Sequence, residues 1–382
     1  MSRVKLGDVV FRIKDFVDKD NTELEFYVGG EHFDNRSLLV KKRGIIAGST
    51  IGPAFNTRFK PGDVLLMSRN PHLRKAGKVD FEGICSDVSY VIRTKNEKML
   101  KQAFIPLLFQ SDAFWRFAEK NKKGSTNFFL NWSDFERFEF DLPSIDAQER
   151  LCNLIWSLND TYESYLTMLE QNKIIIRSRF IELFGTIDLS EQKEDWKALE
   201  ELTEIVTGTT PSTKDDSNWG GDVLWVTPAE LNDESFYVFD TERKITEKGK
   251  KSKALDYMPT GTVLLSSRAP IGKTAICGKP MTCNQGFKNF ICGKKINPVF
   301  LYVIFKNNTQ YLNSIGTGTT FLELSKSRIA KTKIPVPELK IQDEFADFVT
   351  SIKEMDVNLR KGLEKLNKIR NEILNENIPL EE

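Results

Sequence analysis

Apolar residues recur at helical spacing along two long stretches of the chain, and each stretch follows the same short motif. In the first, Gln148 stands five residues after Pro143; in the second, Gln342 stands five residues after Pro337. The pattern predicts a long amphipathic helix after each motif, at about 144–184 and 340–376. Because one helix cannot bury such a stripe alone, we expect the two helices to pack together as an antiparallel coiled coil. The predicted helix–helix contacts are Leu151, Ile155, Leu158, Tyr162, Leu169, Phe345, Ile352, Leu359, Leu366 and Ile373.

Polar residues and glycine mark particular points along these stripes. Gly185 follows the first stripe directly, where a helix C-cap favours glycine. Asn172 interrupts the apolar seam of the first helix, which fixes register at some cost in stability. We expect Gln148 and Gln342 to cap or bridge between each helix and the segment before it.

The segments that precede the two helices also repeat each other. Residues 62–71 (GDVLLMSRNP) align with residues 261–270 (GTVLLSSRAP), and Gly124-Ser125-Thr126 aligns with Gly318-Thr319-Thr320. The offset between the copies drifts only from 199 to 194 residues, which indicates an internal duplication. Each copy predicts turns, short β-type runs and short helices, including one at 102–120 and its counterpart at 298–312.

The duplication predicts an α+β fold: two similar globular modules separated by two long antiparallel coiled-coil helices, with pseudo-twofold symmetry. The expected boundaries are 1–142 for module 1, 143–185 for the central helix, 186–336 for module 2 and 337–382 for the C-terminal helix. A helix of about 35 residues is roughly 50 Å long. Major-groove faces on one side of B-DNA recur every ~34–36 Å, so this length suits two modules that read separate patches of one duplex.

Composition changes this picture little. Apolar residues make up 40% of the chain and charged residues 29%, as in ordinary globular proteins. The sequence contains no long apolar run typical of a membrane span, and its opening residues show no secretory signal. The five cysteines are scattered without CxxC spacing. This pattern favours buried, reduced thiols over a metal site, and it predicts a cytoplasmic location.

The distribution of charge is more informative than the net charge of +1. Residues 36–101 contain 14 Lys and Arg against 5 Asp and Glu, and residues 243–295 contain 12 against 2. One basic region therefore lies in each predicted module. Two such regions in a nearly neutral chain indicate that each module meets a polyanion, the alternative being two solvated basic faces.

Known catalytic patterns are missing from the sequence. The chain has only two histidines and contains no HExxH, Cys/His zinc or EF-hand pattern. It also lacks a GxxxxGK[ST] loop, a GxGxxG fingerprint and a GxSxG elbow, which argues against an ATPase, a dinucleotide enzyme or a serine hydrolase. Residues 70–73 (NPHL) lack the second proline and the aromatic residue of the amino-methyltransferase loop. We therefore expect a non-catalytic protein.

Several motifs in module 2 together resemble a known domain. They are 208–213 (GTTPST), 219–228 (WGGDVLWVTP), 267–273 (SRAPIGK), 284–287 (NQGF) and 334–337 (IPVP) with Gln342 and its helix. This set is similar to the target-recognition domain of type I restriction-modification specificity subunits. The chain departs from the family at Leu224, where proline is common, and module 1 lacks the Gly-x-Thr-Pro opening. Through the duplication, the resemblance extends over nearly the whole chain.

The resemblance implies a DNA-recognition subunit. Each target-recognition domain of the family reads one half of a bipartite DNA target, and the conserved helices set the gap and dock two modification (methyltransferase) subunits. No cofactor is implied for this chain. S-adenosylmethionine belongs to the methyltransferase subunits, and ATP with magnesium belongs to restriction subunits that can join them. The implied setting is DNA methylation and phage defence in the cytoplasm.

Candidate DNA contacts are basic side chains for phosphate and Arg, Asn, Gln, Ser or Thr side chains for base edges. In module 1 they are Lys41, Lys42, Arg43, Arg69, Asn70, Arg74, Lys75, Lys78, Lys123, Ser125 and Thr126. In module 2 they are Thr209, Thr210, Ser212, Lys214, Arg268, Lys273, Asn284, Gln285, Lys288, Thr317 and Thr319. The repeated Arg69/Arg268 pair and the repeated Gly-Ser/Thr-Thr loops are the strongest of these candidates.

Simpler interpretations stand beside these candidates. Arg69 and Arg268 could instead form buried ion pairs, the loops could be plain turns, and Trp219 and Trp225 are more typical of a core than of base stacking. For the whole chain, the alternative is a stand-alone bivalent sequence-specific DNA-binding protein. A single-chain nuclease or methyltransferase is disfavoured by the missing motifs, and a DNA-mimic inhibitor is disfavoured by the basic segments.

Overall fold

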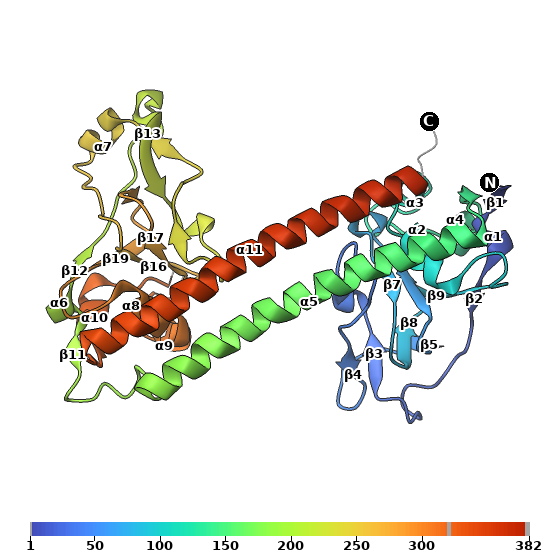
Figure 1. Ribbon diagram of the computed structural model, residues 1–382, viewed down its shortest axis with the longest axis horizontal. Helices are drawn as coiled ribbons and strands as arrows, with labels where there is room; N and C mark the ends of the chain where they lie inside the picture. Colours follow the sequence, from blue (N-terminus) through green and yellow to red (C-terminus); the bar gives the residue numbers. More distant parts are fainter. Residues whose placement is uncertain (1, 319–321, 379–382) are drawn as a thin grey trace. The chain divides into compact units, whose positions relative to one another are not determined.

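The computed structural model describes residues 2–318 and 322–378, and the chain divides into two compact units. Unit 1 comprises Met1–Met168 and Leu359–Glu382, and unit 2 comprises Leu169–Asn358. Two long helices, α5 (Ile145–Phe184) and α11 (Leu339–Asn377), contribute residues to both units. Figure 1 shows the strands and short helices that surround them in each unit.

Unit 1 contains two sheets of short strands and a separate two-stranded pair. Strand β1 (Ser2–Lys5) pairs with β10 (Glu139–Leu142) and leads into helix α1 (Leu6–Val9). The first sheet is antiparallel and has the order β2 (Val10–Ile13), β9 (Ser89–Thr94), β6 (Val64–Met67) and β7 (Ala76–Lys78). The second has the order β4 (Gly44–Ile45), β3 (Phe26–Val28), β8 (Gly83–Ser86) and β5 (Phe55–Phe59).

Unit 2 is built from corresponding parts. Strand β11 (Lys197–Ala198) pairs with β20 (Lys333–Ile334) and leads into α6 (Leu199–Leu202). The first sheet has the order β12 (Thr203–Val206), β19 (Phe287–Cys292), β16 (Val263–Ser266), β17 (Thr274–Cys277) and β14 (Tyr237–Val238). The second has the order β15 (Lys244–Ile245), β13 (Trp219–Val226) and β18 (Thr282–Cys283).

The strand orders confirm the duplication that the sequence predicts. The order β2-β9-β6-β7 in unit 1 is matched by β12-β19-β16-β17 in unit 2. In the second sheets, β3 pairs in parallel with β8, just as β13 pairs in parallel with β18. The aligned segments 62–71 and 261–270 supply the equivalent strands β6 and β16. Both units therefore share this topology, apart from β14 in unit 2 and β5 in unit 1, which have no counterpart in the other unit's sheets.

The short helices differ from the continuous ones predicted from sequence. The segment predicted as one helix at 102–120 is broken into η3 (Gln102–Phe104), α2 (Ile105–Leu108) and α3 (Asp112–Lys120). Ser111 causes the break, because its hydroxyl accepts the Phe114 amide and starts a new helix. Its counterpart in unit 2 is α8 (Pro298–Asn307) followed by α9 (Thr309–Ser314). The remaining short helices are α4 (Trp132–Phe135), α7 (Glu247–Ser252), α10 (Lys326–Ala330), η1 (Gly30–His32), η2 (Pro71–Leu73), η4 (Asp216–Asn218) and η5 (Pro228–Glu230).

The long helices begin and end close to the predicted positions. Helix α5 ends at Phe184, and Gly185, with φ of 73°, donates its amide to the Ile181 carbonyl at 2.8 Å. In unit 1, Cys152 and Ile155 of α5 share a core with Leu374 near the end of α11. In unit 2, Phe180 near the end of α5 contacts Phe345 near the start of α11, with ring centroids 5.6 Å apart. Within each unit the two helices therefore run antiparallel.

The apolar residues along the two long helices pack partly against the other helix and partly against the modules. Ile155, Leu169, Phe345 and Ile352 are buried, and the other six predicted contacts are half-buried. Leu151, Leu158 and Ile373 pack against the module 1 core, so these positions hold the helices to the module. A second line along α11, which the apolar pattern did not reveal, is also buried: Val349, Asp356, Leu363 and Arg370.

This second line includes the charged residues Asp356 and Arg370, so a pattern of apolar residues alone does not predict it. Asp356 is buried in unit 2, where it accepts a hydrogen bond from Asn172 Nδ2 at 2.8 Å and pairs with Lys353 at 3.2 Å. Asn172 thus lies on the helix seam as the sequence predicts, and its partner is a carboxylate. Replacing either partner alone would leave a buried polar group unsatisfied.

Gln148 and Gln342 perform the bridging role predicted for them. Gln148 is fully buried, accepts the Lys101 amide at 2.9 Å and donates to the Met99 and Pro143 carbonyls at 2.9 Å each. Gln342 is also fully buried and makes the same three contacts in unit 2, with the Asn297 amide and the Lys295 and Pro337 carbonyls. Each glutamine therefore ties the start of a long helix to the loop that precedes a short one.

The cysteines also match their prediction. Cys85, Cys152, Cys277 and Cys283 are buried, Cys292 is half-buried, and all five are free thiols. Burial raises the pKa of the Cys85 thiol to about 12 and that of Cys152 to about 11, which makes both thiols unreactive at neutral pH.

Candidate nucleic-acid interface

In unit 1, the fold brings two separately predicted motifs together. Arg69, just after β6, forms an isolated antiparallel bridge with Phe129, and the Asn70 amide donates to the Phe128 carbonyl at 2.8 Å. Lys123 and Phe129 exchange two backbone hydrogen bonds of 2.7 and 3.0 Å, which close a hairpin. The exposed tip of this hairpin carries Gly124 (φ 93°), Ser125 and Thr126.

Unit 2 repeats this arrangement. Arg268, just after β16, bridges Glu323, while Thr317 and Glu323 exchange two backbone hydrogen bonds of 2.9 Å each. Thr317 and Gly318 (φ 123°) are exposed at the start of the hairpin. The predicted contact Thr319 lies outside the described residues. In both units, an exposed arginine therefore lies beside a hairpin that carries a glycine and at least one exposed hydroxyl residue.

The exposure of these arginines contradicts the buried ion-pair interpretation. Arg69 is exposed and has no ion-pair partner within residues 2–318 and 322–378. Arg268 Nε lies 3.3 Å from Glu323 Oε2, but the arginine side chain is 50% exposed. An exposed pair of this kind contributes little to stability, so Arg268 can exchange its partner for another acceptor.

Several other module 1 candidates are engaged within unit 1. Lys41 pairs with Glu163 of α5 at 2.6 Å, and Lys42 pairs with Asp34. Lys78 lies over the Trp156 ring of α5, with its ammonium 5.0 Å from the ring centroid. Arg43 lies over the Phe26 and Phe81 rings at 4.1 and 4.7 Å. Lys41 and Lys78 therefore face the long helix rather than the hairpin.

Arg74 and Lys75 follow η2 and serve local structure. Lys75 Nζ donates to the Gly30 carbonyl at 2.6 Å. Arg74 hydrogen-bonds Asp112 at the start of α3, and Arg36 lies 3.8 Å from the same carboxylate. Burial alone would raise the pKa of Asp112, but the Arg74 hydrogen bond and the charges of Arg74 and Arg36 hold that pKa below its usual value. Asn70 and Arg74 both adopt positive φ, which gives this turn its shape.

In unit 2, the 208–213 motif lies against the 284–287 motif. Thr210 Oγ1 donates to Gln285 Oε1 at 2.6 Å, and the Thr209 amide donates to the Cys283 carbonyl at 3.1 Å. Gly208 is required here, because a Cβ at that position would lie 1.8 Å from the Cys283 carbonyl oxygen. Ser212 and Lys214 are exposed further along the same loop. Two motifs that sequence identified separately thus form one surface.

Three further module 2 candidates have structural partners. Lys288 is buried and lies 3.3 Å from Ser267 Oγ and 3.4 Å from Glu323 Oε1. Lys273 Nζ donates to the Pro228 carbonyl at 3.1 Å, and Asn284 Oδ1 accepts the Gly286 amide at 2.8 Å. Lys288 therefore orients Glu323, the residue that also pairs with Arg268.

The tryptophans occupy the core of the second sheet in unit 2. Trp225 is buried, and Trp219 packs against it edge-to-face with centroids 5.1 Å apart. Arg243, which the sequence reasoning missed, stacks its guanidinium 3.8 Å from the Trp219 ring centroid. The core interpretation of Trp225 is confirmed.

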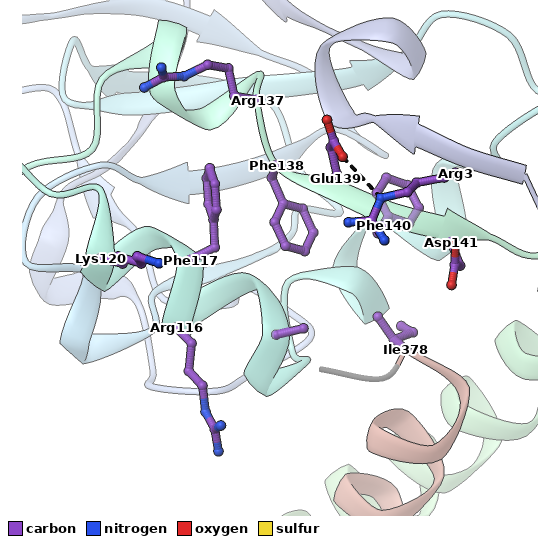
Figure 2. A pocket seen from close by; sticks show the side chains of 11 residues that line it. Arg3, Arg116, Phe117, Lys120, Arg137, Phe138, Glu139, Phe140, Asp141 and Ile378 are labelled. Atoms are coloured by element: carbon purple, nitrogen blue, oxygen red, sulfur yellow. Dashed lines mark hydrogen bonds and ion pairs between the residues drawn. The ribbon is translucent and has the colours of Figure 1, made fainter. Parts of the chain in front are cut away.

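Figure 2 shows a pocket in unit 1 that contains none of the predicted contacts and is lined by basic, acidic and aromatic side chains. A hollow of about 400 Å³ in unit 1 has an aromatic floor, and Arg116 and Lys120 of α3 line it. Arg3 also lines it and pairs with Glu139 at 3.0 Å. The spacing of Arg116 and Lys120, four residues apart on one helix, was the available sequence signal. The aromatic residues of the pocket wall are Phe117, Phe138 and Phe140, and Ile378 also lines the pocket.

The described residues contain neither a metal-binding cluster nor a membrane-spanning helix. Within residues 2–318 and 322–378, no group of three or more His, Cys, Asp or Glu side chains is placed to hold a metal ion. None of the helices in these ranges combines the length and apolarity needed to cross a membrane.

Comparison with known proteins agrees with these motifs. The family model of the type I restriction modification DNA specificity domain matches residues 193–371. The specificity subunit of the type I restriction enzyme MjaIX from Methanocaldococcus jannaschii is 39% identical over 204 residues, covering 52% of this chain and 47% of the relative. The second half of the chain is therefore similar to the type I restriction modification DNA specificity domain. The HindI specificity subunit of Haemophilus influenzae is 27% identical over 183 residues, which cover 47% of this chain and 40% of the relative. The chain thus matches less than half the length of these two curated relatives.

Solved structures share the fold of this chain. The crystal structure of the type I restriction-modification S subunit from M. genitalium superposes with a TM-score of 0.65 at 14% identity, covering 100% of this chain and 96% of the other. A structure that describes the assembly and conformational transition of a type I R-M system gives a TM-score of 0.50 at 17% identity, covering 98% and 96%.

Proposed function

We propose that this chain is the non-catalytic DNA-specificity subunit of a type I restriction-modification complex. Residues 1–142 and 186–336 are its two target-recognition domains, and each reads one half of a bipartite DNA target. The helical segments 143–185 and 337–382 set the gap between the halves and dock two modification subunits.

One observation carries the proposal for DNA recognition. In both units an exposed arginine after the equivalent strand lies beside a hairpin with an exposed hydroxyl residue, Ser125 and Thr126 in unit 1 and Thr317 in unit 2. Arginine recognises guanine O6 and N7 with two hydrogen bonds, while serine and threonine pair with several base edges. A shared topology that presents the same chemistry twice supports two related readers in one chain. The differences between the hairpins, Lys123-Gly124-Ser125 against Thr317-Gly318, support different half-sites.

The long helices support the proposed docking of partner subunits. Both expose large apolar side chains, although the helices already bury a stripe within each unit. On α5 these are Leu154, Leu166, Met168, Ile174, Ile175 and Ile181; on α11 they are Leu339, Met355, Val357 and Ile369. Large apolar side chains exposed on a helix are available for contact with another protein, whereas DNA recognition alone requires polar and basic groups.

The proposal assigns chemistry to the partners. This chain would hold no cofactor; the modification subunits would bind S-adenosylmethionine, and restriction subunits, where present, would use ATP and magnesium. The assembled complex would act in the cytoplasm, in DNA methylation and phage defence.

The test is a single-molecule methylation map of host DNA from cells with this gene intact, deleted and restored. Loss of one bipartite adenine-methylation motif on deletion, and its return on restoration, are the expected results. If every motif persists in the deletion strain although the modification subunits are expressed, the proposal is wrong. Specific DNA binding by the chain alone would then favour a stand-alone bivalent DNA-binding protein.

A further inference from the structure

Two arginines, one in each unit, stack on aromatic rings at corresponding places in the duplicated fold. Arg43 directly precedes β4, the strand that pairs antiparallel with β3. Arg243 directly precedes β15, the strand that pairs antiparallel with β13. Strands β3 and β13 are equivalent, since β3 pairs in parallel with β8 just as β13 pairs in parallel with β18. The fold therefore places an arginine before the same edge strand twice.

In unit 2, the stacked arginine adjoins a loop that carries predicted DNA contacts. Arg243 Cζ lies 3.8 Å from the centroid of the Trp219 ring and 5.4 Å from that of the Trp225 ring. The same two indoles hold the loop in place. Trp219 Nε1 donates to the Ser212 carbonyl at 3.1 Å. Trp225 Nε1 donates to the Thr209 carbonyl, also at 3.1 Å. Arg243 is therefore joined through these rings to the candidate contacts of the loop.

In unit 1, Arg43 is stacked in a similar way. Its Cζ lies 4.1 Å from the centroid of the Phe26 ring and 4.7 Å from that of the Phe81 ring. Phe26 belongs to β3, just as the rings beneath Arg243 belong to β13, so equivalent strands supply aromatic rings in both units. The two lysines that precede Arg43 in the chain each pair with a carboxylate, whereas Arg43 pairs with none among the described residues.

Both guanidinium groups keep their donors available. Arg43 and Arg243 are exposed, and within residues 2–318 and 322–378 neither side chain forms an ion pair or a hydrogen bond. Stacking uses the face of the guanidinium, whereas its N–H groups point outward along the edge of the plane. The rings beneath also restrict the side chain, so less conformational entropy is lost when the edge binds an acceptor. Each arginine therefore presents a positioned fork of donors to solvent.

We propose that Arg43 and Arg243 are matched DNA contacts, one in each unit, and that each donates two parallel hydrogen bonds to neighbouring acceptors on the target duplex. The acceptors are O6 and N7 of a guanine or two oxygens of a phosphate, because both pairs match the spacing of a guanidinium fork. The aromatic rings hold each guanidinium ready for this contact. The inference rests on the proposed role in DNA recognition, and it adds a second arginine to Arg69 in unit 1 and to Arg268 in unit 2.

The test measures the affinity of the assembled complex for a duplex with the target from the methylation map, and for duplexes changed at one base pair of either half. Arg243→Met retains most of the side-chain length without the charge, and it should weaken binding to the target about tenfold or more, as expected for the loss of one bidentate contact. Arg43→Met should do the same through the other half-site. If the wild-type complex distinguishes the duplexes but either variant binds the target as the wild type does, only this inference is wrong. If the wild-type complex does not distinguish them, the proposed function is wrong as well.

Two further variants separate the guanidinium fork from charge alone. Lys253→Met is the control, because it removes a charge of the same sign from an exposed position in the same basic region, and it should bind as the wild type does. An equal loss in this control would show a general charge effect and would refute the inference. Arg243→Lys keeps the charge above the tryptophans but not the fork, so it should bind as weakly as Arg243→Met, and it replaces that variant if Arg243→Met does not fold. Wild-type affinity of Arg243→Lys would also refute the inference.

The pattern of the losses identifies the acceptor. If Arg243 contacts a guanine, Arg243→Met should bind the target and a duplex changed at that one base pair equally well. If it contacts a phosphate, the variant should lose the same factor on every duplex, and the slope of affinity against salt should fall by about one. Either result supports a DNA contact, and it assigns the contact to a base or to the backbone.

Discussion

Replacing Gln342 with leucine should open unit 2 locally without affecting unit 1. The buried amide makes three hydrogen bonds, to the Asn297 amide and to the Lys295 and Pro337 carbonyls, at 2.9, 3.1 and 2.7 Å. At about 1 kcal/mol for each bond, their loss costs about 3 kcal/mol. The cost rises to about 5 kcal/mol if the Asn297 amide and the two carbonyls find no water, because leucine fills the space but offers no donor or acceptor.

Hydrogen exchange with mass spectrometry measures this effect separately in each unit. A single unfolding free energy is not well defined for a chain with two units, so local exchange is the appropriate quantity. A cost of about 3 kcal/mol corresponds to about 100-fold faster exchange around 293–301 and the start of α11, because each 1.4 kcal/mol is a factor of ten. Segments of unit 1 should exchange as in the wild type.

Two further substitutions make this test specific. Gln148→Leu should produce the same acceleration in unit 1, around residues 99–104, because its three contacts are the same. Gln171→Leu, at an exposed position of α5, is the control and should leave exchange unchanged. If Gln342→Leu accelerates exchange less than about fivefold, about 1 kcal/mol, the three hydrogen bonds do not stabilise the joint between helix and module, and the reasoning is wrong.

Two more predictions concern DNA reading and pH. In the assembled complex, Arg268→Ala should relax the sequence preference at one base position, at a cost of about 1–3 kcal/mol. Lys214→Ala should instead weaken binding to all DNA sequences and lower the slope of affinity against salt by about one. Binding-site selection and salt titrations measure the two effects, and identical effects of the two substitutions would contradict the assigned roles. Asp112 has a lowered pKa in the folded state, so its contribution to stability is present above the unfolded pKa of about 3.9 and is lost as pH falls through the lower folded value. Asp112→Asn should therefore reduce the acid sensitivity of hydrogen exchange in α3 as pH falls below the unfolded pKa of about 3.9, and an unchanged pH profile would show that the Arg74 contact adds nothing.

The sequence predicted the elements whose signals are local. The ends of α5 and α11, the Gly185 cap and the roles of the two glutamines follow from residue type and spacing within a short window, and the duplication follows from aligning one half of the chain with the other. Gln148 and Gln342 were recognisable because the same Pro-x4-Gln motif occurs twice at the start of an apolar stripe. A repeat inside one chain indicates which positions have a common structural role, even where identity between the copies is low.

The candidate DNA contacts were harder to sort from sequence. The sequence shows where lysine and arginine occur, but it does not show whether each side chain faces solvent, an aromatic ring or a carboxylate. Only the fold shows that Lys41 pairs with Glu163, that Lys288 is buried beside Ser267, and that Arg69 remains exposed. Their roles in DNA binding stay predictions.

Periodicity by itself determined the two long helices, the duplicated modules and the positions of the strongest motifs, because these depend on neighbours along the chain. The tertiary structure decided which motifs meet: Arg69 with the 123–129 hairpin, Thr210 with Gln285, and Asn172 with Asp356. It also revealed Arg370 and Asn159 as buried donors without acceptors. A charged residue on a helix is expected to face solvent, so burial of this kind depends on the packing of distant segments around it.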